Sequence, residues 1–389
     1  MKRSEWKSNH RVSLLPSSEV YLERLGAAVA TASREVLIEA DHLRDDVAGR
    51  ALAVVLIGAA QRGLRVNVTL QSTGSSSQPS PFIKGLIAAG VKIQSAEAYV
   101  DGRPCPPRKL AVVDGERAFL GGFSFDGDAP VGSPPVQEYG AELVGPLASS
   151  VRLMLFARLA GNRHPVESER RYSRRGRADQ PGGEGWACMV SGDEKSKRGD
   201  VLRHYLEAIR HAEQDIVLAS AYFAPGWRLM KALAEAARRG VRVRLVVQHW
   251  PRHAAARWAM KQIHAYLLRQ GVEMLSYRRS LLHGSVGMVD DQWATICSGS
   301  QNMETHLVVR DRQFNAALRA HLHGLMCFDC KLEDEARLPQ GVGLLRALAG
   351  VVVLRMLDDV PRLPAQSRAV RGTSGVAPPA LGRTASGHS

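Results

Sequence analysis

Two similar stretches of the chain each carry side chains that can exchange protons or hold an anion. In LLHGSVGMVDD, His283 precedes an apolar run and Asp290 follows it. In PPRKLAVVDG, Lys109 and Asp114 flank a similar run. An imidazole can accept or donate a proton near neutral pH, and an ammonium group attracts anions. We therefore take these four residues as the candidate catalytic groups.

The two stretches belong to an internal duplication. The segments AAQRGLRVNVTLQ (59–71) and AARRGVRVRLVVQ (236–248) are identical at seven of thirteen positions, at an offset of 177. Residues 110–124 align with 286–300 at an offset of 176 without a gap, and a third, shorter block lies upstream of these. Blocks that recur in the same order at nearly one offset indicate a duplicated domain.

Each copy alternates short apolar strands with helices of ten or more residues. This order predicts an α/β layer structure. We expect a first domain over 1–161, a basic linker over 162–186, a second domain over 187–340, and an amphipathic segment with a disordered tail over 341–389.

The segment Val342–Leu357 is the nearest candidate for a transmembrane helix, but Arg346 and Arg355 interrupt it. Two interpretations stay open, a packed C-terminal helix or a helix that lies in a membrane interface. The first ten residues have no apolar run and no stretch reaches the length of a transmembrane helix, so we expect neither a signal peptide nor a span.

The composition excludes several classes of protein. Of 389 residues, 45% are hydrophobic and 23% are charged, which excludes a fully disordered, collagen-like or coiled-coil chain. The formal net charge of +14 favours an anionic partner, and charge alone does not choose between nucleic acid and anionic lipid. Five cysteines argue against a disulfide framework and for a reducing compartment. Cys327 and Cys330 form a lone CxxC without the second pair that a zinc site needs.

The candidate residues resemble a known pattern. H-x-K-x4-D followed by G-[SG]-x-N, present twice, is the signature of the phospholipase D superfamily. The segments SAYFAPGWRLMKALAEAARRGVRVRLVVQ, YRRSLLHG, VVRDRQFNAALRAHL and QEYGAELVGP are similar to bacterial cardiolipin synthases, in particular to the shorter B type. The resemblance implies two tandem phospholipase D-like α/β/α sandwich domains in a pseudo-two-fold arrangement, with one active site at their interface.

The resemblance also implies a reaction, the transfer of a phosphatidyl group between phosphatidylglycerol molecules through a phosphohistidine. One imidazole attacks phosphorus and a second protonates the leaving alkoxide. Lys, Asn and Ser side chains hold the phosphate oxygens, and each motif Asp is expected to fix an imidazole or its partner. No metal and no cofactor is required. Carried over, the catalytic residues are His283, Asp290, Lys109 and Asp114, and the phosphate-binding residues are Ser300, Asn302, Ser124 and Ser285.

The chain departs from this pattern. Pro107 stands at the first His position, Ser285 at the second Lys position and Ser124 at the first Asn position. After residue 296 a gapless alignment places Cys297 at the Gly position and Ser300 at the Asn position, whereas a two-residue slip restores GSQN. With one imidazole, the two-step mechanism loses either its nucleophile or its general acid. A substitute role for His42, which follows the first strand, is a further alternative.

Three functions therefore stay open. The first is a cardiolipin synthase-like phosphatidyltransferase, impaired by its degenerate motifs. The second is a catalytically inactive relative that binds lipid or a partner, and the third is a phosphodiesterase or nuclease of the same superfamily. The extended similarity favours an anionic phospholipid membrane containing phosphatidylglycerol and cardiolipin as the partner, with no nucleic acid. We expect a peripheral protein on the cytoplasmic side of the cell membrane, of undetermined oligomeric state.

Overall fold

A computed structural model describes most of the chain. The described residues are 6–71, 79–96, 99–100, 103–104, 108–121, 136–159, 185–191, 198–221, 223–248, 254–298, 305–333 and 343–358. Pro107, Ser124, Ser300, Asn302 and nearly all of the expected linker and C-terminal tail lie outside them.

The first half of the chain contains nine strands and four helices among its described residues. They are β1 (Lys7–Leu15), α1 (Ser18–Ala30), β2 (Glu35–Ala40), α2 (Val47–Gln61), β3 (Arg65–Gln71), α3 (Pro81–Ala88), β4 (Lys92–Ala96), β5 (Tyr99–Val100), β6 (Arg103–Pro104), β7 (Leu110–Val113), β8 (Arg117–Gly121), β9 (Gly140–Val144) and α4 (Pro146–Leu159).

The second half repeats this order. Its elements are β10 (Gly185–Ser191), α6 (Arg198–Arg210), β11 (Asp215–Ser220), α7 (Trp227–Arg238), β12 (Arg242–Val247), α8 (Ala254–Arg269), β13 (Glu273–Tyr277), β14 (Val286–Val289), β15 (Trp293–Ser298), β16 (Thr305–Arg310), α9 (Arg312–Phe328), β17 (Cys330–Leu332) and α10 (Leu344–Asp358). Because β10 begins at Gly185, the expected linker ends two residues too late.

The repeated helix ends form as the sequence predicts. Gly63 follows α2 with a φ of 85°, and Gly240 follows α7 with a φ of 90°. A glycine adopts this left-handed conformation without steric cost, so it stops the helix and turns the chain toward the next strand. In each half, three strands then pair in parallel. β3 lies between β2 and β4, and β12 lies between β11 and β13.

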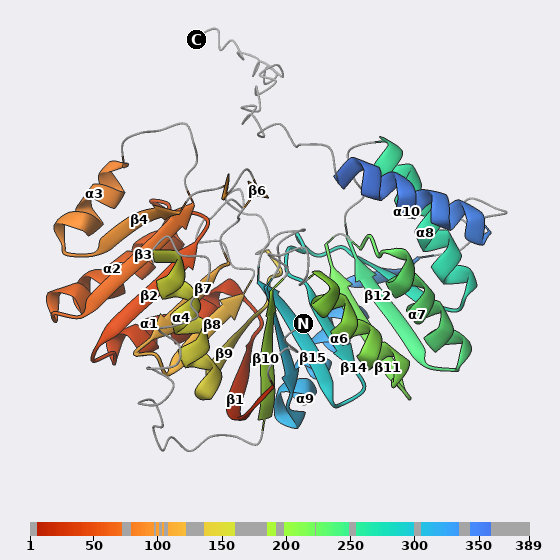
Figure 1. Ribbon diagram of the computed structural model, residues 1–389, viewed down its shortest axis with the longest axis horizontal. Coiled ribbons are helices and arrows are strands. Elements are labelled where there is room, and N and C mark those ends of the chain that lie inside the picture. Colours follow the sequence, from red (N-terminus) through yellow and green to blue (C-terminus); the bar gives the residue numbers. More distant parts are fainter. Residues whose placement is uncertain are drawn as a thin grey trace, which may run out of the picture.

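The strands of the two halves follow equivalent orders from the centre of the sheet to its edges. From β1 the first half runs β9-β8-β7-β2-β3-β4, and from β10 the second half runs β16-β15-β14-β11-β12-β13-β17 (Figure 1). The two central strands are antiparallel, with Lys7 opposite Ala187 and His10 opposite Gly185. The expected pair of tandem α/β sandwich domains is confirmed. Sequence analysis did not foresee β1 and β10, the strands that join the halves.

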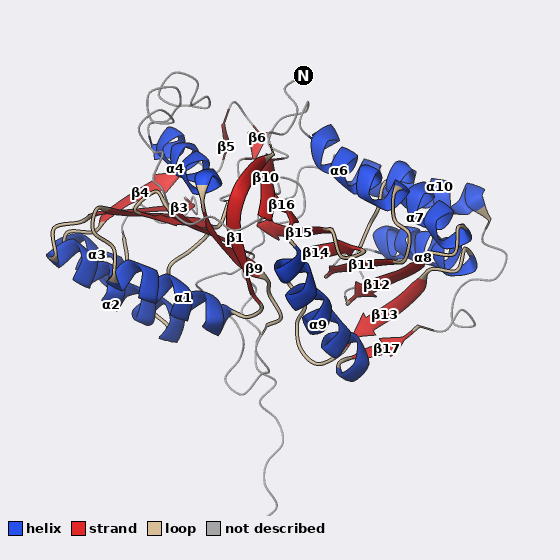
Figure 2. Ribbon diagram, turned by 90° about the horizontal axis from the view of Figure 1, so that it is seen from below, coloured by secondary structure: helices blue, strands red, loops and turns tan. Residues whose placement is uncertain are grey.

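Helices cover both faces of each half, as Figure 2 shows. In the first half α1, α2 and α3 lie on one face of the sheet and α4 on the other. In the second half α6, α7, α8 and α10 lie on one face and α9 on the other. α4 and α9 hold equivalent positions, because each follows the strand next to the central pair.

Three apolar cores stabilise the arrangement. One lies within the first half and one within the second. The third joins the halves, and its members include Val112 and Leu120 from the first and Met288, Ile296 and Phe314 from the second. β15 contacts β8 and β9 there. Burial of apolar surface on both sides holds the two motif-bearing hairpins against each other.

The C-terminal helix α10 packs on α8. Ala347 and Val351 are buried in the second core, and a Cβ on Gly350 would lie 2.7 Å from the carbonyl oxygen of Ala259. One side of the segment therefore packs against the second half, and its other side remains exposed. Among the described residues, no helix is both long and apolar enough to cross a membrane.

Candidate active site

The loop between β13 and β14 carries His283 and is bound to the first half through its backbone. The Gln137 N–H donates to the Leu281 carbonyl oxygen at 2.7 Å, and the His283 N–H donates to the Gln137 carbonyl oxygen at 3.0 Å. These residues form a short parallel bridge between segments far apart in the chain. The position of the candidate nucleophile therefore depends on both halves.

The side chain of His283 also contacts the first half. Its Nδ1 lies 2.7 Å from Oε1 of Glu138, a buried carboxylate that is 6% exposed, whereas the imidazole is 43% exposed. A carboxylate accepts hydrogen bonds, so Nδ1 carries the proton and the Nε2 lone pair is left for another partner. This geometry suits an imidazole that attacks an electrophile or exchanges a proton.

Sequence analysis missed Glu138. The duplication contains a signal for it. Gly121 and Cys297 are equivalent in the alignment of the two copies, and they pair with Gly140 and His306, respectively. Gly140 is therefore equivalent to His306, and Glu138 to Glu304. A glutamate thus stands two residues before the equivalent position in both copies. Glu304 lies outside the described residues.

Gly284 permits the close approach of the two halves beside His283. A Cβ at this position would lie 2.6 Å from Cδ2 of Tyr139 and 2.8 Å from its backbone nitrogen. Any larger residue would displace either the histidine loop or the segment that carries Glu138.

Lys109 is buried, and its charge is compensated within the first half. Its Nζ lies 3.1 Å from Oδ2 of Asp41, and its side chain is 5% exposed. The neighbouring Arg108 N–H donates to Oε1 of Glu39 at 3.2 Å. Two acidic residues near the end of β2 therefore hold the loop that carries the candidate lysine.

The second half has hydroxyl groups in the corresponding place. The Oγ atoms of Ser285 and Ser220 lie 3.0 Å apart. The gapless alignment equates Ser285 with Lys109, and the strand pairings equate Ser220 with Ala40, next to Asp41. One side of the site therefore has a charged pair and the other a neutral pair.

Asp114 and Asp290 do not lie beside the imidazole. Lys109 and Asp114 flank β7, and five residues of extended chain span about 16 Å. The Asp290 carboxylate accepts the backbone N–H groups of residues 213–215 at 2.9–3.0 Å, and that of Asp114 accepts those of residues 33–35 at 2.8–2.9 Å. Each motif Asp was expected to fix an imidazole or its partner. In the structure each of these carboxylates binds the backbone at the start of the adjacent strand, and Glu138 makes the contact to the imidazole.

The environment of Asp114 stabilises its charged form. Burial acts to raise the pKa of the carboxyl, but the backbone N–H groups of Glu35, Ser33 and Arg34 and the Ser33 hydroxyl outweigh it and lower the pKa below its ordinary value. Both Asp114 and Asp290 have a positive φ, 54° and 48°, which an aspartate tolerates better than most residues.

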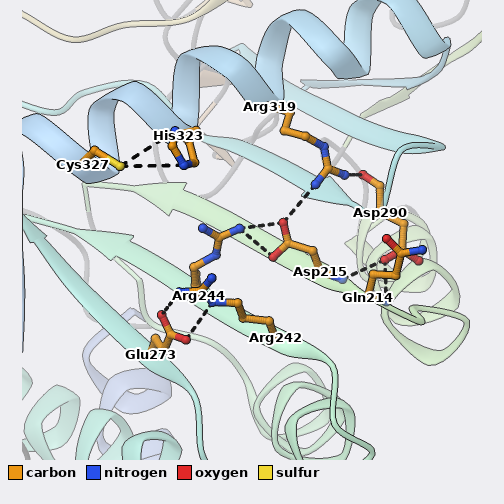
Figure 3. A network of polar contacts seen from close by, with 9 residues as sticks. All are labelled: Gln214, Asp215, Arg242, Arg244, Glu273, Asp290, Arg319, His323 and Cys327. Atoms are coloured by element: carbon orange, nitrogen blue, oxygen red, sulfur yellow. Dashed lines mark hydrogen bonds and ion pairs between the residues drawn. The ribbon is translucent and has the colours of Figure 1, made fainter.

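An ion-pair network surrounds each of these turns. In the second half Asp215, the first residue of β11, accepts from Arg244 at 2.7 Å and from Arg319 at 3.3 Å, and Arg319 also donates to the Asp290 carbonyl oxygen (Figure 3). In the first half Glu35, the first residue of β2, pairs with Arg152 of α4, as Asp215 pairs with Arg319 of α9. The motif aspartates thus belong to a repeated structural network.

The strand pairing also fixes part of the uncertain alignment. β7 pairs with β8 and β14 with β15 in the same register, so Cys297 occupies the position of Gly121. The gapless alignment therefore holds through Ser298, the last residue described before 305.

Other chemical features of the described residues lie apart from His283. An open hollow of about 690 Å³ along α9 is lined by Asp291, Arg312, Arg319 and His323 with two alanines, at the end of β14 opposite His283. No group of three or more His, Cys, Asp or Glu residues in the described part of the chain is placed to hold a metal ion. No described hydrogen bond joins His42 to His283.

Comparisons with known proteins agree with this architecture. Residues 205–325 match a family model described as cardiolipin synthase, PLD-like domain. Cardiolipin synthase B of Escherichia coli and that of Shigella flexneri are each 32% identical over 358 residues, which cover 87% of this chain and 86% of theirs. The crystal structure of phosphatidylserine synthase from Haemophilus influenzae aligns with a TM-score of 0.64 at 12% identity, over 91% of this chain and 94% of that one. By its identity to these synthases over nearly their whole length, and by its duplicated fold, the chain belongs to the cardiolipin synthase B family of the phospholipase D superfamily.

Proposed function

We propose that this chain transfers a phosphatidyl group from one phosphatidylglycerol to another, releasing glycerol and forming cardiolipin, with His283 as the nucleophile. The observation that carries the proposal is the 2.7 Å contact between His283 Nδ1 and the buried Glu138 carboxylate across the interface of the two halves. It orients the only described imidazole of the two motifs and leaves Nε2 free to react.

In the first step Nε2 attacks the phosphorus of the donor lipid. The Nε2–P bond forms, the P–O bond to the headgroup glycerol breaks, and the departing glycerol alkoxide takes a proton from water. The imidazole becomes positively charged as it attacks, and the Glu138 carboxylate stabilises that charge. In the second step a hydroxyl of the acceptor phosphatidylglycerol attacks phosphorus, the Nε2–P bond breaks, and the hydroxyl proton passes to water.

Two substitutions slow this reaction. Pro107 has no proton to donate to the alkoxide, and acid–base assistance typically contributes about a hundred- to ten-thousandfold. Ser285 adds no positive charge at the phosphate, and its hydroxyl is bound to that of Ser220. We therefore infer slow turnover, with Lys109, which is paired with Asp41, as the remaining motif cation.

The same two substitutions favour a second candidate function, a catalytically silent relative that binds anionic lipid. Without the second imidazole and lysine, the site retains groups that bind a phosphate but lacks half of the proton-transfer machinery. Under both proposals the partner is an anionic phospholipid membrane, with the protein bound peripherally on its cytoplasmic side.

Restoring the missing groups tests the first proposal. The double variant Pro107→His with Ser285→Lys, assayed on phosphatidylglycerol vesicles by mass spectrometry, should form cardiolipin about a hundredfold or more faster than wild type. Each single variant serves as the matched control. A folded double variant that binds vesicles but forms no more cardiolipin than wild type would favour the silent relative.

A further inference from the structure

The helix α10 lies on the outside of the second half but has no polar face. One side, with Ala347, Gly350 and Val351, packs on α8. The opposite side is also apolar, because Leu345 is 81% exposed and Val352 is 50% exposed. A helix that is apolar all round is normally covered on all sides. In Figure 1, α10 lies on the outer side of α8, at one end of the molecule.

The exposed charged side chains of α8 and of the start of α10 have one sign. On α8 the indole of Trp258 is exposed beside the exposed Arg257 and Lys261, and on α10 Arg346 is exposed next to Leu345. The sequence of α8 contains no acidic residue, and that of α10 contains a single one at its last position. We call the set Arg257, Trp258, Lys261, Leu345, Arg346 and Val352 the α8–α10 surface.

The first half has an exposed apolar helix without this charge. On α2, Val47 is almost fully exposed and Val54 is 70% exposed. The sequence of α2 contains one cation, Arg50, beside Asp45, whereas that of α8 contains three cations and no acidic residue. Apolar exposure on α2 is therefore not combined with excess positive charge. Figure 2 places α2 and the α8–α10 pair on opposite sides of the molecule, so a flat partner cannot contact both.

The residue that follows β12 contacts the loop that holds the candidate nucleophile. Gln248 directly follows β12, and its side chain accepts from the Leu282 N–H and donates to the Ser280 carbonyl oxygen. α8 begins six residues after Gln248.

We propose that the α8–α10 surface docks the protein on an anionic phospholipid bilayer, with Leu345, Val352 and Trp258 entering the headgroup region. The exposed cations of the two helices bind lipid phosphates, which matches their uniform sign. Tryptophan is well suited to this depth, since its ring is apolar and its N–H is polar. The inference rests on the proposed function only in taking a membrane lipid as the substrate.

Vesicle binding of the full chain tests the docking without any turnover. The probe is vesicles of phosphatidylglycerol and phosphatidylcholine in equal amounts, compared with phosphatidylcholine alone. The double variant Leu345→Ser with Val352→Ser should bind the anionic vesicles roughly tenfold more weakly than wild type. Arg346→Gln should weaken binding and reduce its salt dependence. The matched control is Val54→Ser, which removes an equally exposed apolar side chain and should bind as wild type does.

A double variant that binds as tightly as wild type, or a Val54→Ser variant that is weakened equally, would overturn the docking. A dimeric wild type together with a monomeric double variant would also overturn the docking, because a second copy of the chain would then cover this surface. Failure of the proposed function has a different signature, since wild type would bind through α10 but form no cardiolipin.

Discussion

Replacing Glu138 by Gln removes the negative charge that faces His283 while keeping the size of the side chain. The carboxylate is 6% exposed and 2.7 Å from Nδ1, so water cannot replace it. The imidazole gains positive charge as Nε2 attacks phosphorus. The contact is therefore stronger in the transition state than in the ground state, which is the condition for an effect on the rate.

The expected magnitude follows from the change in the hydrogen bond. A bond to a charged group contributes about 1.5–3 kcal/mol and one between neutral groups about 0.5–1.5 kcal/mol, so the variant loses about 1–2 kcal/mol. That loss corresponds to a turnover roughly 5- to 30-fold slower. The assay is cardiolipin formation from phosphatidylglycerol vesicles, normalised to folded protein.

A matched control separates this effect from general destabilisation. Glu142 lies on β9, is equally buried, and pairs with Arg24 and Arg117 rather than with an imidazole. Glu142→Gln should lower the Tm without changing turnover per folded molecule. If Glu138→Gln keeps the wild-type rate, or if both variants lose activity in proportion to their loss of stability, Glu138 does not position His283.

Three further outcomes are expected. Gly284→Ala should lower the free energy of unfolding by about 1–3 kcal/mol in urea titrations, because its Cβ meets Tyr139; unchanged stability would show that the halves separate easily there. Asp114→Asn and Asp290→Asn should each lower the free energy of unfolding by about 1–3 kcal/mol but keep turnover per folded molecule, and loss of activity at full stability would restore their catalytic assignment. Burial lowers the pKa of His10 to about 4, so the unfolded chain takes up this proton first and stability should fall as the pH drops from about 6.5 to about 4; a His10→Gln variant with the same pH profile would refute this.

Much of the fold follows from local patterns in the sequence. The segments 59–71 and 236–248 each contain a helix end, a glycine with positive φ and an alternating strand, and these features form from neighbouring residues. The central strands β1 and β10 could not be predicted in this way. Each is positioned by partners far along the chain, as in the pairing of Lys7 with Ala187, and they share little sequence.

The site was only partly predictable for the same reason. His283 and Lys109 stand in recognisable motifs, but the partner of His283 lies 145 residues away in the other half. The motif aspartates were expected beside the imidazole and instead lie at the opposite ends of their strands. The duplication held a signal for this, because both copies contain the Asp while the His and the Lys each occur once. A group retained where its catalytic neighbours are missing is typical of a structural role.

Cardiolipin formation by the purified full chain on phosphatidylglycerol vesicles, read by mass spectrometry beside His283→Ala, tests the central claim most directly. If His283 carries the phosphatidyl group, wild type accumulates cardiolipin over a long incubation and the variant forms none. Equal cardiolipin from both proteins, or none from a folded wild type bound to the vesicles, would contradict the assignment of His283 as the nucleophile of a phosphatidyltransferase.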